Sequence, residues 1–221
     1  MIKTLDLFDL EHTLAKEELQ KYDYPWEIIP HIKEMILSLA RNLPAEYQEI
    51  QPQVWVHNSA RLASSVCLQG PCIIGKNCEI RQAAFLRGAV LAGEACVIGN
   101  SVELKNTILF DQVQVPHFNY VGDSILGYKA HFGAGAITSN IKSDRRLIVL
   151  KNGKETIETG LQKLGALCGD FVEIGCNSVL NPGTVIGKNS QIYPLTSLRG
   201  VIPADSIVKS GQFEVIAKRK D

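Results

Sequence analysis

From residue 54 onward, large aliphatic side chains recur every six residues. A period of six fits neither the 3.6-residue period of an α-helix nor the two-residue alternation of a strand. It predicts a solenoid with three flat faces, one inward aliphatic side chain per face and coils of about 18 residues. The repeating positions are Val56, Leu62, Leu68, Ile74, Ile80, Leu86, Ala92, Ile98 and Leu104.

The phase of this repeat slips and then breaks. Inward positions come one residue early at Leu109, Val115 and Val121, and one earlier still at Leu126 and Phe132. Residues 139–167 interrupt the pattern with a polar stretch that contains the turn pair Asn152-Gly153, which predicts a loop or a β-hairpin excursion. Loops of this length in compact domains are usually functional or disordered. The repeat resumes with Cys168, Ile174, Leu180, Ile186, Ile192 and Leu198.

Residues 1–50 follow a different pattern. Helical spacing runs over residues 5–21 and 26–43, and Pro30 lies in the first turn of the second stretch, where proline is tolerated. Because terminal repeats must hide an open apolar end, we expect a short helical cap over one end of the solenoid. The chain therefore divides into a helical cap at 1–50 and an all-β domain at 51–221, whose tail ends in the solvated run Lys218-Arg219-Lys220.

Composition narrows the possible functions. The chain has 221 residues, and its 23 Lys and Arg balance its 23 Asp and Glu, which argues against the basic face that nucleic-acid binding needs. No apolar run is long enough to span a bilayer, and the first residues lack a signal-peptide core. The six cysteines form no CxxC pair, which is typical of buried reduced thiols in a cytoplasmic protein. No metal site is implied.

The repeat resembles the hexapeptide-repeat, left-handed parallel β-helix family, and the left hand comes from that resemblance. Within the family, several stretches resemble the acetyltransferase domain of bifunctional enzymes that make UDP-N-acetylglucosamine, and two others are more similar to the archaeal members. The resemblance covers roughly residues 50–205. The matching stretches are RGA at 87–89, GNSVELK at 99–105, VPHFNYVGD at 115–123 and GAGAITSN at 133–140, with the archaeal-like TGLQKLGA at 159–166 and NPG at 181–183.

The resemblance implies an acyltransferase of nucleotide-sugar biosynthesis for the cell envelope. Acetyl-CoA would give its acetyl group to the amine of a glucosamine-1-phosphate-like amino sugar phosphate, with His117 as general base. An imidazole suits that role because its pKa lies near the operating pH. Nothing in the sequence matches the glycine-rich start of a nucleotidylyltransferase domain, so we expect no pyrophosphorylase activity.

Two cations are the candidates for holding the phosphate. Arg87 and Lys105 stand 18 residues apart, so they should stack one coil above the other, where like charges repel unless an anion lies between them. On spacing alone, Arg87 and Lys105 could instead be two solvated surface charges. His117, likewise, could be a lone structural histidine. Glu103 would orient His117 or hold the amine, or else be a carboxylate on the coil surface.

The remaining roles come from the resemblance. Tyr120 would donate to the phosphate, and Asn140 would position either the amine or the carbonyl under attack, unless it is only a turn asparagine that opens the loop. At 140–143 the chain has NIKS where the bacterial enzymes have NYDG. Cys176 replaces a serine near the thioester and is expected to be buried, without covalent catalysis. The full set adds His131 and Arg146 as substrate-binding residues, and Ala134, Cys176 and Lys163 as cofactor-binding residues.

Active sites of this family lie between subunits, which implies a homotrimer. Apolar residues such as Phe110, Phe118 and Phe132 would need cover if they point outward. The alternative to the enzyme is a non-catalytic protein that binds sugar phosphates or nucleotide sugars, or a partner subunit of a nucleotidylyltransferase. Such a sensor needs the cations but no base, so the retained His117 favours the enzyme.

Overall fold

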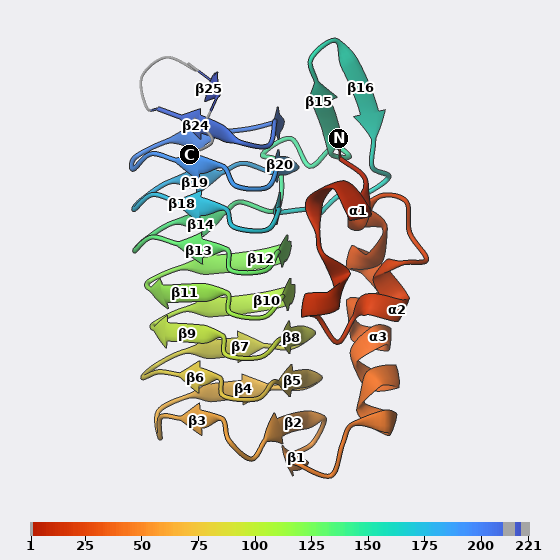
Figure 1. Ribbon diagram of the computed structural model, residues 1–221, viewed down its shortest axis with the longest axis vertical. Coiled ribbons are helices and arrows are strands. Elements are labelled where there is room, and N and C mark those ends of the chain that lie inside the picture. Colours follow the sequence, from red (N-terminus) through yellow and green to blue (C-terminus); the bar gives the residue numbers. More distant parts are fainter. Residues whose placement is uncertain (1, 210–214, 218–221) are drawn as a thin grey trace.

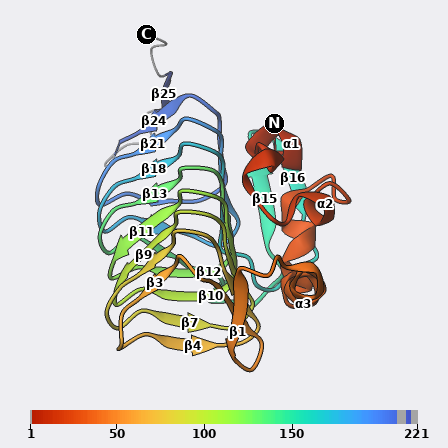
Figure 2. The same cartoon turned by 60° about the horizontal axis from the view of Figure 1, so that its bottom comes forward.

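The structure, a computed structural model, describes residues 2–209 and the backbone of residues 215–217. Residues 54–208 wind into a stack of coils with three flat strand faces, shown from the side in Figure 1 and tilted in Figure 2. The predicted fold class, a left-handed parallel β-helix, is confirmed. The expected solvated run Lys218-Arg219-Lys220 lies outside the described residues.

Each face of the solenoid is a stack of short parallel strands. Face 1 contains β2 (Val54–His57), β5 (Cys72–Ile74), β8 (Val90–Ala92), β17 (Ala166–Cys168), β20 (Thr184–Ile186) and β23 (Val201–Ile202). Face 2 contains β3 (Arg61–Leu62), β6 (Glu79–Ile80), β9 (Val97–Asn100), β11 (Gln114–His117), β13 (His131–Phe132), β18 (Glu173–Ile174), β21 (Gln191–Ile192) and β24 (Ser206–Val208), with β25 (Val215–Ala217) antiparallel to β24. Face 3 contains β4 (Cys67–Gln69), β7 (Phe85–Arg87), β14 (Ile137–Thr138), β19 (Val179–Leu180) and β22 (Ser197–Leu198). The longer strands β10 (Glu103–Leu109) and β12 (Tyr120–Leu126) begin on face 3 and end on face 1.

The strand register explains the phase slip in the sequence. Ile74 pairs with Ala92, 18 residues further on, whereas Ile108 pairs with Ile125, 17 residues further on. Leu91 likewise pairs with Ile108, 17 residues further on, so two successive coils are each one residue shorter, one for each slip. Ile125 in turn pairs with Leu167, so the interruption leaves the solenoid and returns to the next coil without breaking the stack.

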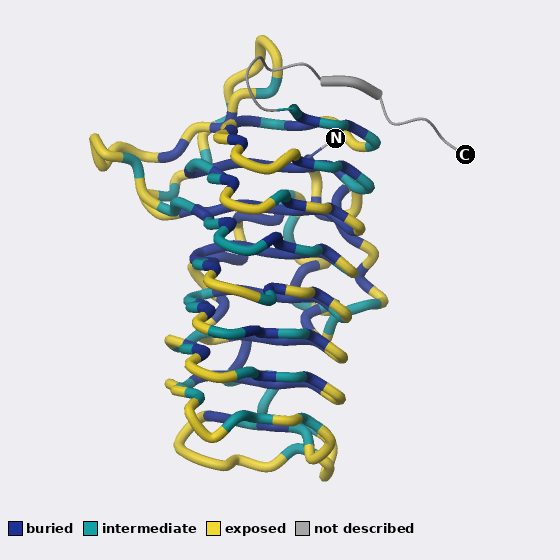
Figure 3. Tube along the Cα trace, turned by 90° about the vertical axis from the view of Figure 1, so that its left-hand side faces the viewer, coloured by how far each residue is buried: buried dark blue, intermediate teal, exposed yellow. Residues whose placement is uncertain are grey.

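Inward aliphatic side chains form the core, and the corners between faces are tight turns. Figure 3 shows buried strand residues in each coil and exposed stretches at the corners. Many corners place a residue other than glycine at a φ between 48° and 60°, the left-handed region, which costs such residues roughly 1–2 kcal/mol each. Backbone hydrogen bonds between successive coils offset that cost. The first corners of this kind recur at Asn77, Ala83, Ala89, Ala95 and Ser101.

The interruption contains the predicted hairpin, formed by β15 (Val149–Asn152) and β16 (Glu155–Glu158). Asn152 pairs with Glu155, so the two turn residues are Gly153 and Lys154, one position later than the predicted pair. Gly153 has a φ of 61°, which a glycine adopts without strain. The hairpin lies beside the C-terminal coils in Figure 1 and contacts β23.

The N-terminal segment lies along the side of the solenoid rather than over an open end, as Figures 1 and 2 show. The aromatic rings of Phe8 and Phe110 lie 5.1 Å apart between centroids, and the helix α3 (Ile32–Leu39) contacts β8 and β10. The strand β1 (Tyr47–Gln51), which spans the expected boundary at residue 50, pairs antiparallel with β2. The helices are α1 (Thr4–Leu7), η1 (Leu10–His12), α2 (Lys16–Leu19), η2 (Pro25–His31), α3 (Ile32–Leu39) and η3 (Ala40–Asn42).

Face 1 carries an apolar outer surface that accounts for this position. Ile73, Leu91, Ile108, Ile125 and Leu167 pair in register up the face, and all five are fully buried although they neighbour the inward positions. Burying each such side chain stabilises the fold by about 1.5–3 kcal/mol relative to leaving it exposed. The helical segment therefore packs where the solenoid has the most apolar surface to cover.

Candidate functional site

The two candidate phosphate-binding cations lie on the same edge of face 3. Leu86 pairs with Leu104, so Arg87 and Lys105, which follow them, stand at equivalent positions in adjacent coils. The sequence prediction that they stack is confirmed by this register. The same position is occupied by Gln69 one coil below Arg87, where Gln69 pairs with it directly.

Each cation has a carboxylate partner in the described chain. Arg87 Nη1 lies 2.8 Å from Glu103 Oε1, and Lys105 Nζ lies 3.3 Å from Asp123 Oδ2. The Arg87 pair is half-exposed and contributes little stability, whereas Asp123 is buried. The carboxylates relieve the repulsion between the cations, so an anion that binds at this edge must compete with them.

Tyr120 and Asn140 extend the cluster into the following coil. Asn140 Nδ2 donates to the Tyr120 hydroxyl at 3.2 Å and also to Asp123 Oδ2. Burial of the phenol, together with the nearby Asp123 and Glu103 carboxylates, raises the pKa of Tyr120. Tyr120 therefore stays protonated and keeps an O–H group that can donate to a ligand. Asn140 also opens the excursion, because its carbonyl accepts from Leu164 N at 3.0 Å where the chain returns.

His117 lies at the end of β11, on the corner where face 2 passes into face 3. Its backbone N–H donates to the buried Asn119 side chain at 3.0 Å, and its carbonyl accepts from Gly135 N at 3.0 Å, so the backbone is held on both sides. The side chain is exposed, and within the described residues its imidazole makes no hydrogen bond or ion pair. A bond from Glu103 to His117, one of the three alternatives for this carboxylate, is not made in the described chain, where Glu103 accepts from Arg87 instead.

Ala134 and Cys176 follow His117 up the same corner. Asn177 N donates to Ala134 O at 2.8 Å, which places Ala134 and Cys176 in adjacent coils. The prediction that Cys176 is buried is wrong: the thiol is exposed, because the side chain points out of the corner and not into the core. Cys67 is exposed as well, while the other four cysteines are buried and reduced, as expected.

His131 lies beside Cys176 on face 2. Both line a cavity of about 400 Å³, together with Tyr193 and Pro194. His131 Nδ1 lies 2.8 Å from Glu173 Oε2, one coil further along. A substrate-binding candidate and a cofactor-binding candidate from the sequence therefore meet at one cavity.

The two cationic candidates of the excursion, Lys163 and Arg146, are both exposed. Lys163 is exposed and pairs with Ile141, next to Asn140 at the foot of the excursion. Arg146 is exposed, and its backbone N–H donates to Asp144 Oδ1 at 3.0 Å. Within the described chain neither side chain is bonded to the cluster on face 3.

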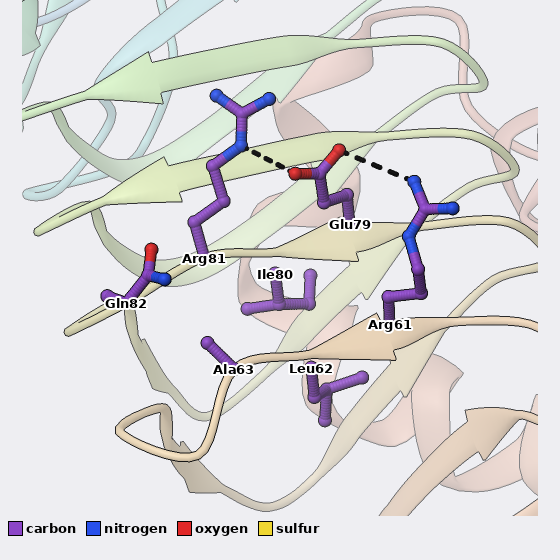
Figure 4. Close-up of a pocket in the computed structure, with 7 residues that line it drawn as sticks. All are labelled: Arg61, Leu62, Ala63, Glu79, Ile80, Arg81 and Gln82. Atoms are coloured by element: carbon purple, nitrogen blue, oxygen red, sulfur yellow. Dashed lines mark hydrogen bonds and ion pairs between the residues drawn. The ribbon is translucent and has the colours of Figure 1, made fainter.

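A separate cavity of about 310 Å³ lies on face 2 near the N-terminal end of the solenoid (Figure 4). Glu79 lies between two arginines, with Arg81 Nε at 2.8 Å and Arg61 Nη2 at 3.6 Å. The hydrogen bond from Arg81, followed by the charges of both arginines, lowers the pKa of Glu79. Glu79 is shared by the two arginines, which leaves one net positive charge, and all three residues lie in coils that precede the cluster.

Two residues of the buried network were not predicted from the sequence. Asn106 and Asp123 are bonded at 2.8 Å and sit 17 residues apart, one shortened coil. Both occupy left-handed corners, with φ values of 50° and 48°. Polar residues at equivalent corners of adjacent coils are the signal that would have predicted this pair.

Neither a membrane-crossing helix nor a metal centre is found in the described part of the chain. None of its helices has the length and apolar character that a membrane crossing requires. Among the same residues, no group of three or more His, Cys, Asp or Glu side chains is arranged to hold a metal ion.

Comparisons with known proteins agree with the repeat. The family model described as "GMPPB C-terminal domain" matches residues 68–143. The chain is 33% identical over 138 residues to the "Bifunctional protein GlmU" of Methanococcus maripaludis strain C5, which covers 62% of this chain and 33% of the relative. It is also 33% identical over 204 residues to the "Bifunctional sugar-1-phosphate nucleotidylyltransferase/acetyltransferase" of Sulfurisphaera tokodaii. That match covers 86% of this chain and 51% of the relative. The chain thus spans between a third and a half of these two relatives.

Among solved structures, the "polySia specific acetyltransferase NeuO" superposes with a TM-score of 0.48 and 11% identity, over 75% of this chain and 76% of that one. The stacked coils and the cluster at their corner define a hexapeptide-repeat protein with a left-handed parallel β-helix. Over the matched part, the chain is similar to the repeat domains of bifunctional sugar-1-phosphate enzymes.

Proposed function

We propose that the protein is an N-acetyltransferase that moves the acetyl group of acetyl-CoA to the amine of an amino sugar phosphate. The observation that carries the proposal is the corner of the solenoid at β11, β10 and β12. There an exposed imidazole, without a partner in the described chain, stands three residues before Tyr120, at the start of the face whose opposite edge carries Arg87 and Lys105. A base, a phosphate-binding edge and a hydroxyl donor are the groups that this reaction needs.

The reaction balances with these residues. The amine nitrogen of the acceptor attacks the thioester carbonyl, and the C–S bond breaks as the new C–N bond forms. His117 takes the proton that the amine loses, and the departing thiolate is protonated to give free CoA. Arg87, Lys105 and the Tyr120 hydroxyl hold the phosphate, which fixes the amine near the imidazole.

Acetyl-CoA is proposed to lie along the corner above His117. Ala134 and Cys176 continue that corner, and the cavity beside Cys176 and His131 offers a concave apolar lining from Tyr193 and Pro194. Lys163 and Arg146 supply positive charge for the phosphates of the cofactor or the acceptor. Cys176 is assigned contact only, without a covalent intermediate.

A homotrimer is part of the proposal. Phe118 and Leu195 are exposed by 64% and 73%, and both lie on the corner that carries His117. Exposed apolar side chains gathered at a proposed active site support cover by a second copy of the chain. Sedimentation analysis of the purified chain tests this assembly, and a monomer at all concentrations speaks against it.

The reaction is tested by following thiol release from acetyl-CoA with a panel of amino sugar phosphates. Glucosamine-1-phosphate is the expected acceptor, and glucosamine without phosphate should react far more slowly. If no acceptor releases thiol while sugar phosphates still raise the melting temperature, the protein is a sugar-phosphate sensor and the enzymatic proposal fails.

Replacing Arg87 by Gln should raise the KM for the sugar phosphate about 10–100-fold with little change in kcat, because a charge-assisted bond to phosphate is worth about 1.5–3 kcal/mol. Glutamine already stands at the equivalent position of the preceding coil, Gln69, so the fold should tolerate it. Arg199 follows Leu198 on the same face and edge, two coils beyond the coil that contains Asn140, and Arg199→Gln is the matched control. Equal KM values for the two variants would remove Arg87 from the phosphate site.

A further inference from the structure

Asp123 is a buried carboxylate at the centre of the cluster on face 3. Only 3% of its surface is exposed, and it lies on the corner where β12 passes from face 3 to face 1. Its Oδ2 accepts from Lys105 Nζ at 3.3 Å and from Asn140 Nδ2, and its Oδ1 accepts from Asn106 Nδ2 at 2.8 Å. A carboxylate with several donors from neighbouring coils is held in one orientation.

The chemistry of Asp123 dictates how its partners are turned. An ionised carboxylate only accepts hydrogen bonds, so Asn140 must direct its NH₂ group toward it. The second N–H of that group donates to the Tyr120 hydroxyl at 3.2 Å. Both N–H groups of Asn140 are then used within the chain, and the Tyr120 oxygen is used as an acceptor. What remains for a ligand is the Asn140 side-chain carbonyl oxygen and the Tyr120 O–H proton.

We propose that Asp123 is a positioning residue that sets the direction of hydrogen bonding in the acceptor site. Held by Asp123, Asn140 Oδ1 accepts a hydrogen bond from the amine of the acceptor, and the Tyr120 O–H donates to its phosphate. This inference rests on the proposed acetyltransferase function and goes beyond it. It assigns Asn140 to the amine and not to the carbonyl under attack, because that carbonyl needs a donor.

The same network joins the site to the N-terminal segment. Asn106 Nδ2, which donates to Asp123, also donates to the carbonyl of Ile29 in η2 at 3.1 Å. The side-chain amide of Asn106 therefore donates to two acceptors, the Ile29 carbonyl in the N-terminal segment and the Asp123 carboxylate in the site, and these fix its orientation. The helical segment on face 1 helps to hold Asp123 in the position that orients Asn140.

Asp123→Asn tests the direction of the hydrogen bonds with almost no change in shape. The new amide offers one acceptor oxygen where the carboxylate offered two, so Asn106 and Asn140 compete for it and Lys105 loses its counter-charge. We expect kcat/KM for the amino sugar phosphate to fall about 10–100-fold, while the KM for acetyl-CoA stays unchanged. A loss confined to the acceptor is what a positioning role predicts and a general loss of packing does not.

The exchange of the two side chains is the sharper test. In the double variant Asp123→Asn, Asn140→Asp, the new carboxylate at position 140 again turns an acceptor oxygen toward the amine, and it accepts from the new amide at position 123. It should recover much of the kcat lost by Asp123→Asn, whereas the KM for the sugar phosphate stays raised because the carboxylate at position 140 also accepts from the Tyr120 O–H. The single variant Asn140→Asp places two carboxylates together and should remain poor. A double variant no better than Asp123→Asn overturns the assignment of Asn140 to the amine.

Asp170 provides the matched control. It is equally buried and binds Lys188 Nζ at 3.0 Å, Asp9 N at 2.7 Å and Tyr128 N at 2.9 Å, away from the cluster. Asp170→Asn should lower the melting temperature and leave the acceptor kinetics unchanged. If the wild-type protein is active and Asp123→Asn behaves like Asp170→Asn, the positioning role of Asp123 is wrong and the proposed function stands. If wild type transfers acetyl to no amino sugar phosphate, the proposed function is wrong and the positioning role falls with it.

Discussion

His117→Ala is expected to lower kcat by about 10²–10⁴-fold, the usual contribution of a general base, while binding of the sugar phosphate is retained. The proposed phosphate contacts are those of Arg87, Lys105 and Tyr120, none of which is bonded to the imidazole in the described chain. The stability should change by no more than about 0.5 kcal/mol, because the side chain is exposed and makes no bond within the described residues. Thiol release gives kcat, and calorimetric titration with the sugar phosphate gives the affinity.

His57 serves as the control for this substitution. It lies in β2, bonds locally to the Ser59 hydroxyl at 2.8 Å, and is several coils away from β11. His57→Ala should keep the wild-type kcat. Turnover by His117→Ala at the wild-type rate would exclude the imidazole as the base, and loss of phosphate affinity in that variant would instead place His117 among the binding residues.

The solenoid could be predicted from the sequence because its physical cause is periodic. An inward side chain must be apolar once per face, and the predicted inward positions from Ile74 to Leu104 are indeed buried. The stacking of Arg87 on Lys105 followed from the same period. Positions of this kind depend only on the register of the coils, which the sequence carries repeatedly.

The place of the helical segment depended on a second pattern, in the residues that face outward. On face 1 the outward positions are apolar, as in Ile73 and Leu91, whereas the equivalent positions of face 2 include Arg61, Glu79 and Gln114. Comparing the outward residues of the three faces predicts which face is covered. Considered alone, the inward residues predicted that the helices cover an open end of the solenoid. In the structure they lie along its side.

The details of the site were harder to predict because they depend on side-chain partners. Glu103 was a candidate to orient His117 or to hold the amine, but its carboxylate lies 2.8 Å from Arg87 in the neighbouring coil, and that ion pair determines its orientation. Cys176 was expected inside because the six cysteines, with no CxxC pair among them, indicated buried reduced thiols. Its exposure follows from the corner, where the side chain next to a left-handed residue, Asn177, points outward. Register predicts which residues are neighbours, and bonding between those neighbours decides what each can do.

Gly99→Ala is expected to disturb the site without touching any ligand. A Cβ at Gly99 would overlap the carbonyl oxygen of Pro116 in the next coil, far inside contact distance, so the backbone at Pro116 must move. Because Pro116 has a fixed φ and directly precedes His117, the displacement passes to the proposed base. Overpacking of this kind costs about 1–3 kcal/mol or more of unfolding free energy. A shift of about 1 Å in a catalytic group can lower kcat about 10²-fold.

Gly75→Ala separates these two effects, since it creates the same kind of clash elsewhere. Its Cβ would lie 2.5 Å from the carbonyl oxygen of Gly93, in coils that precede the site. Both variants should melt at lower temperatures than wild type, but at a temperature where both are folded only Gly99→Ala should lose kcat. Equal kcat values in the two variants would show that His117 does not depend on the close contact between Gly99 and Pro116. A loss of kcat specific to Gly99→Ala would mean that the tight stacking of coils, which stabilises the solenoid, also positions its catalytic base.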